Sequence, residues 1–195
     1  PKQEERKPRE IKLFDPVAHD AQKAYEAQQA KLQQQQQQTQ KSAEWQMQKI
    51  IDYIIQFLIR DEHNAHHVGY CNDKTQWSKY KVVIVPSNFF DNNIYGTQQS
   101  MPSLPLQEIE GIPFLYGSPH IEKIENTIVC YADLIASTYF LISRYEEYIN
   151  PNKNRDTHGR YIGKQSIPAK ANFIHRPIIE EYSELLRKLL QQTNI

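Results

Sequence analysis

Residues 131–177 constrain the fold more than any other part of the chain, because an apolar helical pattern there leads directly into a long polar connection. Between residues 134 and 149, apolar side chains recur at spacings of three and four until the middle of the segment is apolar almost all round. This pattern predicts a buried α-helix over residues 133–149. Asp133 is placed to cap its start, and Asn150-Pro151 ends it because proline cannot continue the helical hydrogen-bond ladder.

The polar side chains of this stretch are the main candidates for a binding site or an interface. Residues 152–176 form a connection longer than is usual in a compact domain, which is typical of a functional or docked segment. Arginines there can pair with carboxylate or phosphate groups, tyrosines offer flat stacking faces, and a histidine beside an aspartate can act as a general base. The alternative is a purely structural role, in which a network of ion pairs and hydrogen bonds holds the loop against its helix. The candidates are Asp133, Arg144, Glu146, Glu147, Asp156, His158, Arg160, His175 and Arg176.

Several runs of sequence are similar to a known domain. They are DLIASTYFLISRYEEY and DTHGRYIGKQSIPAKANFIHRPIIEEYSELLRKLL, with YKVVIVPSNFF and LPLQEIEGIPFLYGSPHIE upstream. Through them, residues 47–195 resemble the N-terminal accessory domain, of unassigned function, that precedes the catalytic domain in a group of bacterial polysaccharide deacetylase-like proteins. The resemblance implies a non-catalytic module that packs on or orients a catalytic domain lying beyond residue 195. That domain is the expected partner, and a polysaccharide is a second one.

Deacetylases of this class use a metal-bound water, and they need an Asp-Asp pair as base and metal ligand together with an H-(S/T)-x-x-H pair on a following helix. The chain has no Asp-Asp pair, and His63 and His67, four residues apart in HNAHH, lack the Ser/Thr. The two histidines predict either a divalent metal site on one helix face or a polar helix end with surface imidazoles. We therefore expect no catalytic residue, metal or cofactor in this chain, and we assign any divalent metal to the catalytic domain. The alternative is a stand-alone hydrolase or carbohydrate-binding domain that uses the loop of His158 and His175.

Residues 1–46 differ in composition from the rest of the chain. Residues 20–46 are rich in alanine, glutamine and lysine, with six consecutive glutamines at positions 33–38. These residue types favour a helix, but apolar positions are too sparse for a core-facing stripe or for coiled-coil heptads. We expect an exposed helix or disorder in this extension, which is foreign to the domain or, alternatively, a native interaction element. Residues 47–195 are then one domain, of a length that suits a single hydrophobic core.

The pattern over residues 47–195 predicts an α/β (or α+β) fold with a small mixed, partly parallel sheet flanked by helices. Helices are expected over residues 50–59 and 177–192 as well as 133–149, and strands over 68–70, 82–85, 111–116, 121–123 and 127–131. Residues 91–111 read as a long connection. Ser87 and Asn88 follow the central strand 82–85 and are weaker site candidates, because loops at the carboxyl ends of parallel strands bind ligands. The alternative is a turn with local backbone hydrogen bonds.

Charge and hydropathy restrict the possible partners. The formal net charge is +0, so nothing in the whole-chain electrostatics favours nucleic acid or an anionic membrane. The sequence contains no run of about 18 apolar residues, so it predicts no membrane span. Cys71 and Cys130 form no metal-binding pair motif, and we expect reduced thiols, with a disulfide as the alternative. Since no secretory signal is visible, the expected location is the cytoplasm.

Overall fold

The computed structural model describes residues 16–90, 101–150 and 153–193. The chain divides between Glu44 and Trp45 into two compact units. Helix α1 (Pro16–Ile59) contributes to both, and nearly all its side chains before Glu44 are exposed, as the sparse apolar positions predict. The expectation of a helical or disordered extension is met by a helix from Pro16 onward. Whether residues 1–46 are foreign to the domain stays a prediction.

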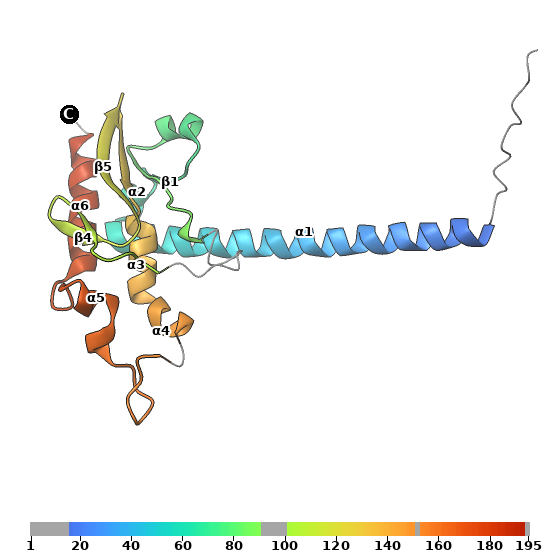
Figure 1. Ribbon diagram of the computed structural model, residues 1–195. Helices are drawn as coiled ribbons and strands as arrows, with labels where there is room; N and C mark the ends of the chain where they lie inside the picture. The colour runs from blue at the N-terminus through green and yellow to red at the C-terminus, as the bar shows by residue number, and fades with distance from the viewer. Residues whose placement is uncertain (1–15, 91–100, 151–152, 194–195) are drawn as a thin grey trace, which may run out of the picture. The chain divides into compact units, whose positions relative to one another are not determined.

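The second unit is built on a mixed four-stranded sheet, which confirms the predicted fold class (Figure 1). Strand β2 pairs in parallel with β1 on one side and with β6 on the other, while β5 is antiparallel to β6. A separate antiparallel pair is formed by β3 and β4. The strands are β1 (Val68–Tyr70), β2 (Val82–Ile84), β3 (Gln107–Ile109), β4 (Ile112–Phe114), β5 (Gly117–Ile124) and β6 (Thr127–Ala132).

Helices and short helical turns make up most of the remaining regular structure of the described residues. The longest after α1 is α6 (Ile178–Gln192), whose predicted apolar stripe is buried against the core. The others are α2 (Glu62–Ala65), η1 (Lys74–Lys79), α3 (Leu134–Ile142), α4 (Tyr145–Ile149), η3 (Gly163–Gln165) and α5 (Ile167–Lys170).

The central strand β2 buries both of its faces. Val82 and Ile84 point to the main core, which also contains apolar residues of α1, α3 and α6, whereas Val83 points to a smaller cluster with Trp77 of η1. This division follows from the two-residue period of a strand. Each fully buried Val or Ile side chain stabilises the fold by roughly 1.5–3 kcal/mol. The Thr127 hydroxyl donates to the carbonyls of Trp77 and Tyr80, which ties η1 to the start of β6.

Three sequence predictions differ locally from the structure. The helix expected over residues 133–149 is broken into α3 and α4 at Arg144, which has a left-handed φ of 54°. Apolar spacing continues across the break, so the pattern could not reveal a residue outside the right-handed region. Part of the expected long connection 91–111 forms β3, and its residues 91–100 lie outside the described part. The 152–176 connection also contains η3 and α5, which are too short to produce a recognisable period.

Among the glycines that the structure describes, Gly117 should tolerate substitution least. Its φ is +94°, and a Cβ there would lie 2.2 Å from the Tyr131 carbonyl oxygen and 2.7 Å from the Asp133 nitrogen. We expect Gly117→Ala to lower the free energy of unfolding by about 3 kcal/mol, from backbone strain and the clash together. Gly159→Ala is the matched control, because Gly159 has a φ of +76° but no atom within 4 Å of the added Cβ. Urea denaturation measures both, and equal losses would contradict the role of the close approach.

Candidate functional site

The candidate residues do not converge on one cleft, and their contacts divide into three groups. Asp133 and Ser87 meet at the carboxyl ends of the parallel strands. Around α4, Arg144 pairs with Glu147, and Glu146 accepts a hydrogen bond from the loop after the helix. The remaining candidates serve the turn of residues 155–161 and the segment before α6.

Asp133 is completely buried and is the acceptor of the first group. Its Oδ1 accepts the backbone N–H of Ala136 at 2.9 Å, which caps α3 as the sequence predicts. Its Oδ2 accepts the Tyr70 hydroxyl at 2.9 Å, the Ser87 N–H at 2.8 Å and the Ser87 hydroxyl at 2.6 Å. One carboxylate therefore joins the end of β1, the segment after β2 and the start of α3.

The electrostatics of Asp133 reflect two opposed effects. Burial raises the pKa of Asp133, because a charged carboxylate loses its hydration, while the hydrogen bonds from Ala136, Ser87 and Tyr70 oppose that rise. Because the side chain has no accessible surface, it cannot reach a substrate in solution. Its position suits a structural anchor.

Ser87 lies where the rule for parallel strands predicts, but the sequence did not reveal its partners. Tyr70 was not a candidate, although its place at the end of β1 was a signal that could have found it, since the ends of parallel strands share one edge of the sheet. Asn88, the second weaker candidate, is exposed and has a left-handed φ of 65°.

The second group holds the loop against α4. Glu146 is buried, and both its carboxylate oxygens accept the backbone N–H of Ile167, at 3.1 and 3.0 Å. Arg144 donates from Nε and Nη2 to Glu147 at 2.6–2.8 Å, but its side chain is 72% exposed. Arg155 lies 3.9 Å from the same Glu147 carboxylate. Glu146 is thus the anchor of this group, and the exposed arginine is a peripheral member.

Asp156 closes a turn within the loop. It accepts the backbone N–H groups of His158 at 2.9 Å and Arg160 at 2.8 Å, and the Arg160 Nε at 2.9 Å. The Arg160 backbone hydrogen bond is the largest cause that lowers the pKa of Asp156. His158 meets this carboxylate through its backbone, not through its imidazole, so the expected Asp-His pairing of a general base is not observed.

Arg176 and His175 lie before α6. The Arg176 guanidinium donates to Glu181 at 2.8 Å and to the Gly111 carbonyl at 3.1 Å, which ties this segment to the turn between β3 and β4. His175 is exposed, and among the described residues no hydrogen bond or ring contact joins it to His158.

The histidines of α2 and its end form a small surface cluster. The rings of His63 and His67 lie 5.6 Å apart between centroids, edge to face. The pKa of His67 is lowered by partial burial, then by Lys81, His63 and His66. Over residues 16–90, 101–150 and 153–193, no group of three or more His, Cys, Asp or Glu side chains is arranged to hold a metal ion.

Two further features of the described residues are the state of the cysteines and the apolar character of the helices. Cys71 and Cys130 are both free thiols, and burial raises the pKa of Cys130 to about 12. Within the described part of the chain, none of the helices combines the length and apolar character that crossing a membrane requires.

Comparison with known proteins yields one family. The model of a family described as "Family of unknown function (DUF7033)" matches residues 17–195. No curated protein and no solved structure matches the chain.

Removing the Asp133 carboxylate should strongly destabilise the domain. Asp133→Ala leaves buried donors of Ser87 and Ala136 without an acceptor, and we expect a loss of about 3–5 kcal/mol in the free energy of unfolding. Asp73→Ala is the control, since exposed Asp73 also caps a helical turn by accepting the Thr75 N–H, and its loss should cost only about 1 kcal/mol. Chemical denaturation would refute the anchor role if the two losses were equal.

Substitution of Glu146 should lower the free energy of unfolding more than substitution of Arg144, although the two residues are close together at the start of α4. Glu146→Ala removes the acceptor of a buried N–H and should cost about 1–3 kcal/mol, whereas Arg144→Ala removes an exposed ion pair and should cost less than about 1 kcal/mol. Limited proteolysis adds a second measurement, because Glu146→Ala should speed cleavage within residues 153–166. A larger effect of Arg144→Ala in both measurements would reverse this assignment.

Proposed function

This chain belongs to the DUF7033 family, whose function is unknown, and we propose that it is a non-catalytic accessory module of a polysaccharide deacetylase-like protein. In this proposal the module packs on or orients a catalytic domain that follows it. Its polar loop and helix ends hold the shape of the docking surface, and the partner supplies the metal and the acid-base groups.

One observation carries the proposal: three candidate carboxylates accept hydrogen bonds from the backbone of their own chain. Asp133 accepts the N–H groups of Ala136 and Ser87, Glu146 accepts that of Ile167, and Asp156 accepts those of His158 and Arg160. A general base must direct a lone pair at the proton of a substrate. Carboxylates that are already bound to the backbone serve the fold, and His158, the base expected in the hydrolase alternative, meets Asp156 through its backbone N–H and not through its imidazole.

The exposed side chains beside these anchors suit a protein partner. Tyr148 is 76% exposed, and its ring centroid lies 6.0 Å from that of buried Tyr145, so its position is supported from below. Exposed Arg144 is held in place by Glu147. Tyrosine and arginine are the residue types that contribute most at protein interfaces, particularly where they are already ordered before binding. We infer that the surface of Tyr148 and Arg144 is the centre of the docking site.

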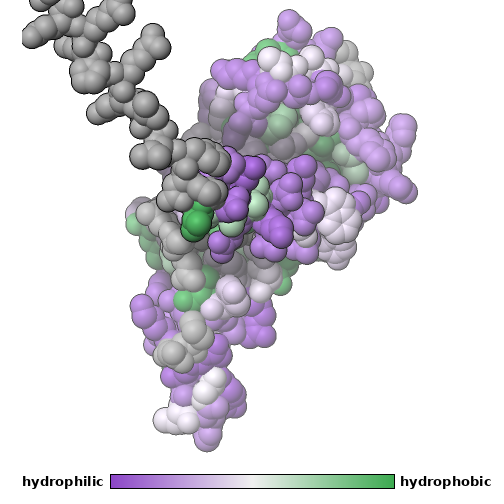
Figure 2. All heavy atoms as spheres, turned by 90° about the vertical axis from the view of Figure 1, so that its right-hand side faces the viewer, coloured by the Kyte–Doolittle hydropathy of each residue, from purple (hydrophilic) through white to green (hydrophobic). Residues whose placement is uncertain are grey.

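The face of the molecule shown in Figure 2 is compatible with an interface between domains of one protein. On the face shown in Figure 2, hydrophilic residues dominate and hydrophobic side chains are scattered. Interfaces between domains are more polar than obligate subunit interfaces.

The two free thiols also fit the cytoplasmic location that the sequence favours, because thiols stay reduced there.

The kind of partner rests on sequence resemblance. The runs DLIASTYFLISRYEEY and DTHGRYIGKQSIPAKANFIHRP resemble those of the accessory domain that precedes deacetylase-like catalytic domains. The resembling residues include the Asp133 cap, the Glu146 anchor and the Asp156 turn, so the similarity covers the elements that shape the proposed docking site. A polysaccharide is then the expected substrate of the partner.

The proposal is tested first by activity. The purified chain, incubated with Zn²⁺ or Co²⁺, should release no acetate above background from N-acetylglucosamine oligosaccharides or acetylated xylan. Metal-dependent release that a chelator abolishes would overturn the non-catalytic assignment.

Docking is tested by calorimetry with the catalytic domain of a deacetylase-like protein that carries this module. Tyr148→Ala should weaken binding about tenfold or more, as loss of an interface hot spot does. Ile124→Ala is the control, because Ile124 is also an exposed apolar residue, 40% accessible, but lies at the turn between β5 and β6. No binding, or equal effects of both variants, would refute the docking surface.

A further inference from the structure

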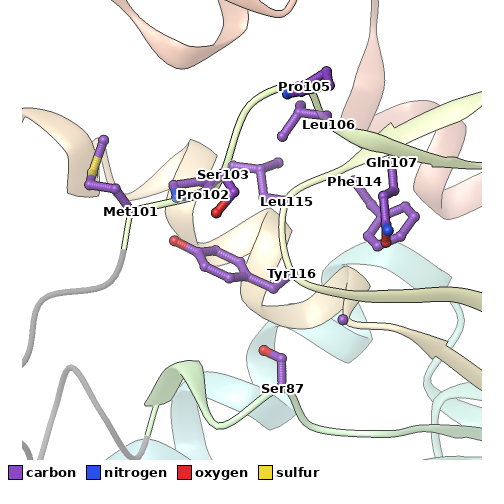
Figure 3. Close-up of a pocket in the computed structure, with 11 residues that line it drawn as sticks. Ser87, Met101, Pro102, Ser103, Pro105, Leu106, Gln107, Phe114, Leu115 and Tyr116 are labelled. Carbon is purple, nitrogen blue, oxygen red and sulfur yellow. The ribbon is translucent and has the colours of Figure 1, made fainter.

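A cavity of about 430 Å³ lies beside Ser87, just beyond the carboxyl end of β2 (Figure 3). Its other walls come from residues 101–103 and 105–107, before and at the start of β3, and from residues 114–117, which run from the end of β4 to the start of β5. Small-molecule sites typically have volumes of this order. In open α/β sheets, ligands bind beyond the carboxyl ends of the parallel strands, so both the size and the place of this cavity suit a ligand.

The lining chemistry selects an uncharged ligand. In the part of the chain that the structure describes, no Asp, Glu, Lys, Arg or His lines the cavity. An ionised ligand would therefore lose hydration without gaining an opposite charge, which is unfavourable. Pro102, Leu106 and Tyr116 supply apolar surface, while Ser87, Ser103 and Gln107 supply polar groups.

Ser87 presents a defined hydrogen-bonding group to this space. Its hydroxyl donates to the buried Asp133 carboxylate at 2.6 Å, so the oxygen lone pairs are what remains for a ligand. Ser87 therefore acts as an acceptor, and a ligand must bring an O–H or N–H donor. The negative charge of Asp133 behind the serine also disfavours an anion at this point.

Tyr116 forms a rigid wall of the cavity. Its carbonyl accepts the Asp133 N–H at 2.9 Å, and its ring packs against Phe89 with a centroid distance of 4.7 Å. A wall held by both its backbone and its ring is preorganised, so little conformational entropy is lost when a ligand contacts it.

We propose that this cavity binds a neutral saccharide unit. A sugar ring has hydroxyl donors for Ser87, donors and acceptors for Ser103 and Gln107, and a C–H face for apolar walls and the Tyr116 ring. A purely apolar ligand would form no hydrogen bond with any of these three polar groups. The site goes beyond the docking proposal and is independent of it, because it uses neither Tyr148 nor Arg144.

Saturation-transfer NMR on the whole chain tests the site, with cellobiose and N,N′-diacetylchitobiose as probes. We expect transfer to ring protons of at least one of the two sugars. Ser103→Trp should fill the exposed side of the cavity and reduce affinity at least tenfold, and Gln107→Ala should reduce it about two- to tenfold by removing one neutral hydrogen bond. The matched controls are Ser118→Trp and Gln165→Ala, which change exposed residues of the same types outside the lining and should bind as the unaltered chain does.

Each other outcome overturns the assignment. If saturation is transferred to neither sugar, the proposed saccharide site is refuted. If binding survives both Ser103→Trp and Gln107→Ala, the sugar binds outside this cavity. Equal or stronger binding of glucuronate or of indole would contradict a neutral saccharide as the ligand. Circular dichroism establishes that each variant is folded, and should Ser103→Trp fail to fold, the milder Gln107→Ala still decides the result. Catalytic-domain binding is measured separately, so failure here leaves the docking proposal unaffected.

Discussion

The second unit depends on one buried carboxylate and the groups that donate to it. Asp133 has no accessible surface, and it accepts hydrogen bonds from Tyr70, from Ser87 and from the first turn of α3. Burial of a charge is costly, and it is tolerated here because several donors replace the lost hydration. The same contacts hold three segments that are distant in the chain, so the carboxyl end of the parallel strands is tied to the start of α3.

The other carboxylates repeat this principle nearer the surface. Glu146 holds α5 through the Ile167 N–H, and Asp156 closes its turn through two backbone N–H groups. Such contacts order a long connection whose own apolar content is low. Acidic residues in a polar loop thus have a structural use that requires no reaction, and this is the physical basis of our proposal of an accessory module with an ordered docking surface.

The two proposed surfaces share that framework but use it differently. The docking surface consists of exposed side chains, Tyr148 and Arg144, that α4 and Glu147 hold in place. The cavity lies where Asp133 orients the Ser87 hydroxyl and the Tyr116 carbonyl. At the cavity preorganisation comes from a buried acceptor, Asp133, whereas at the docking surface it comes from the half-buried Glu147 and the Tyr145 ring.

Local sequence patterns determined the elements of this protein, and the tertiary structure decided how they meet. The two-residue period of β2, the apolar stripe of α6 and the Asp133 cap depend on neighbouring residues, so they could be predicted. The break at Arg144 and strand β3 could not, because spacing alone does not report a left-handed residue or a three-residue pairing. Asp133 meets Ser87 and Tyr70 across 46 and 63 residues, and His158 turns out to meet Asp156 only through its backbone. The long-range contacts of Asp133 depend on strand order, which packing of the whole domain sets, so no short stretch of sequence reveals them, whereas the Asp156 turn is local and its backbone geometry decides which group of His158 meets the carboxylate.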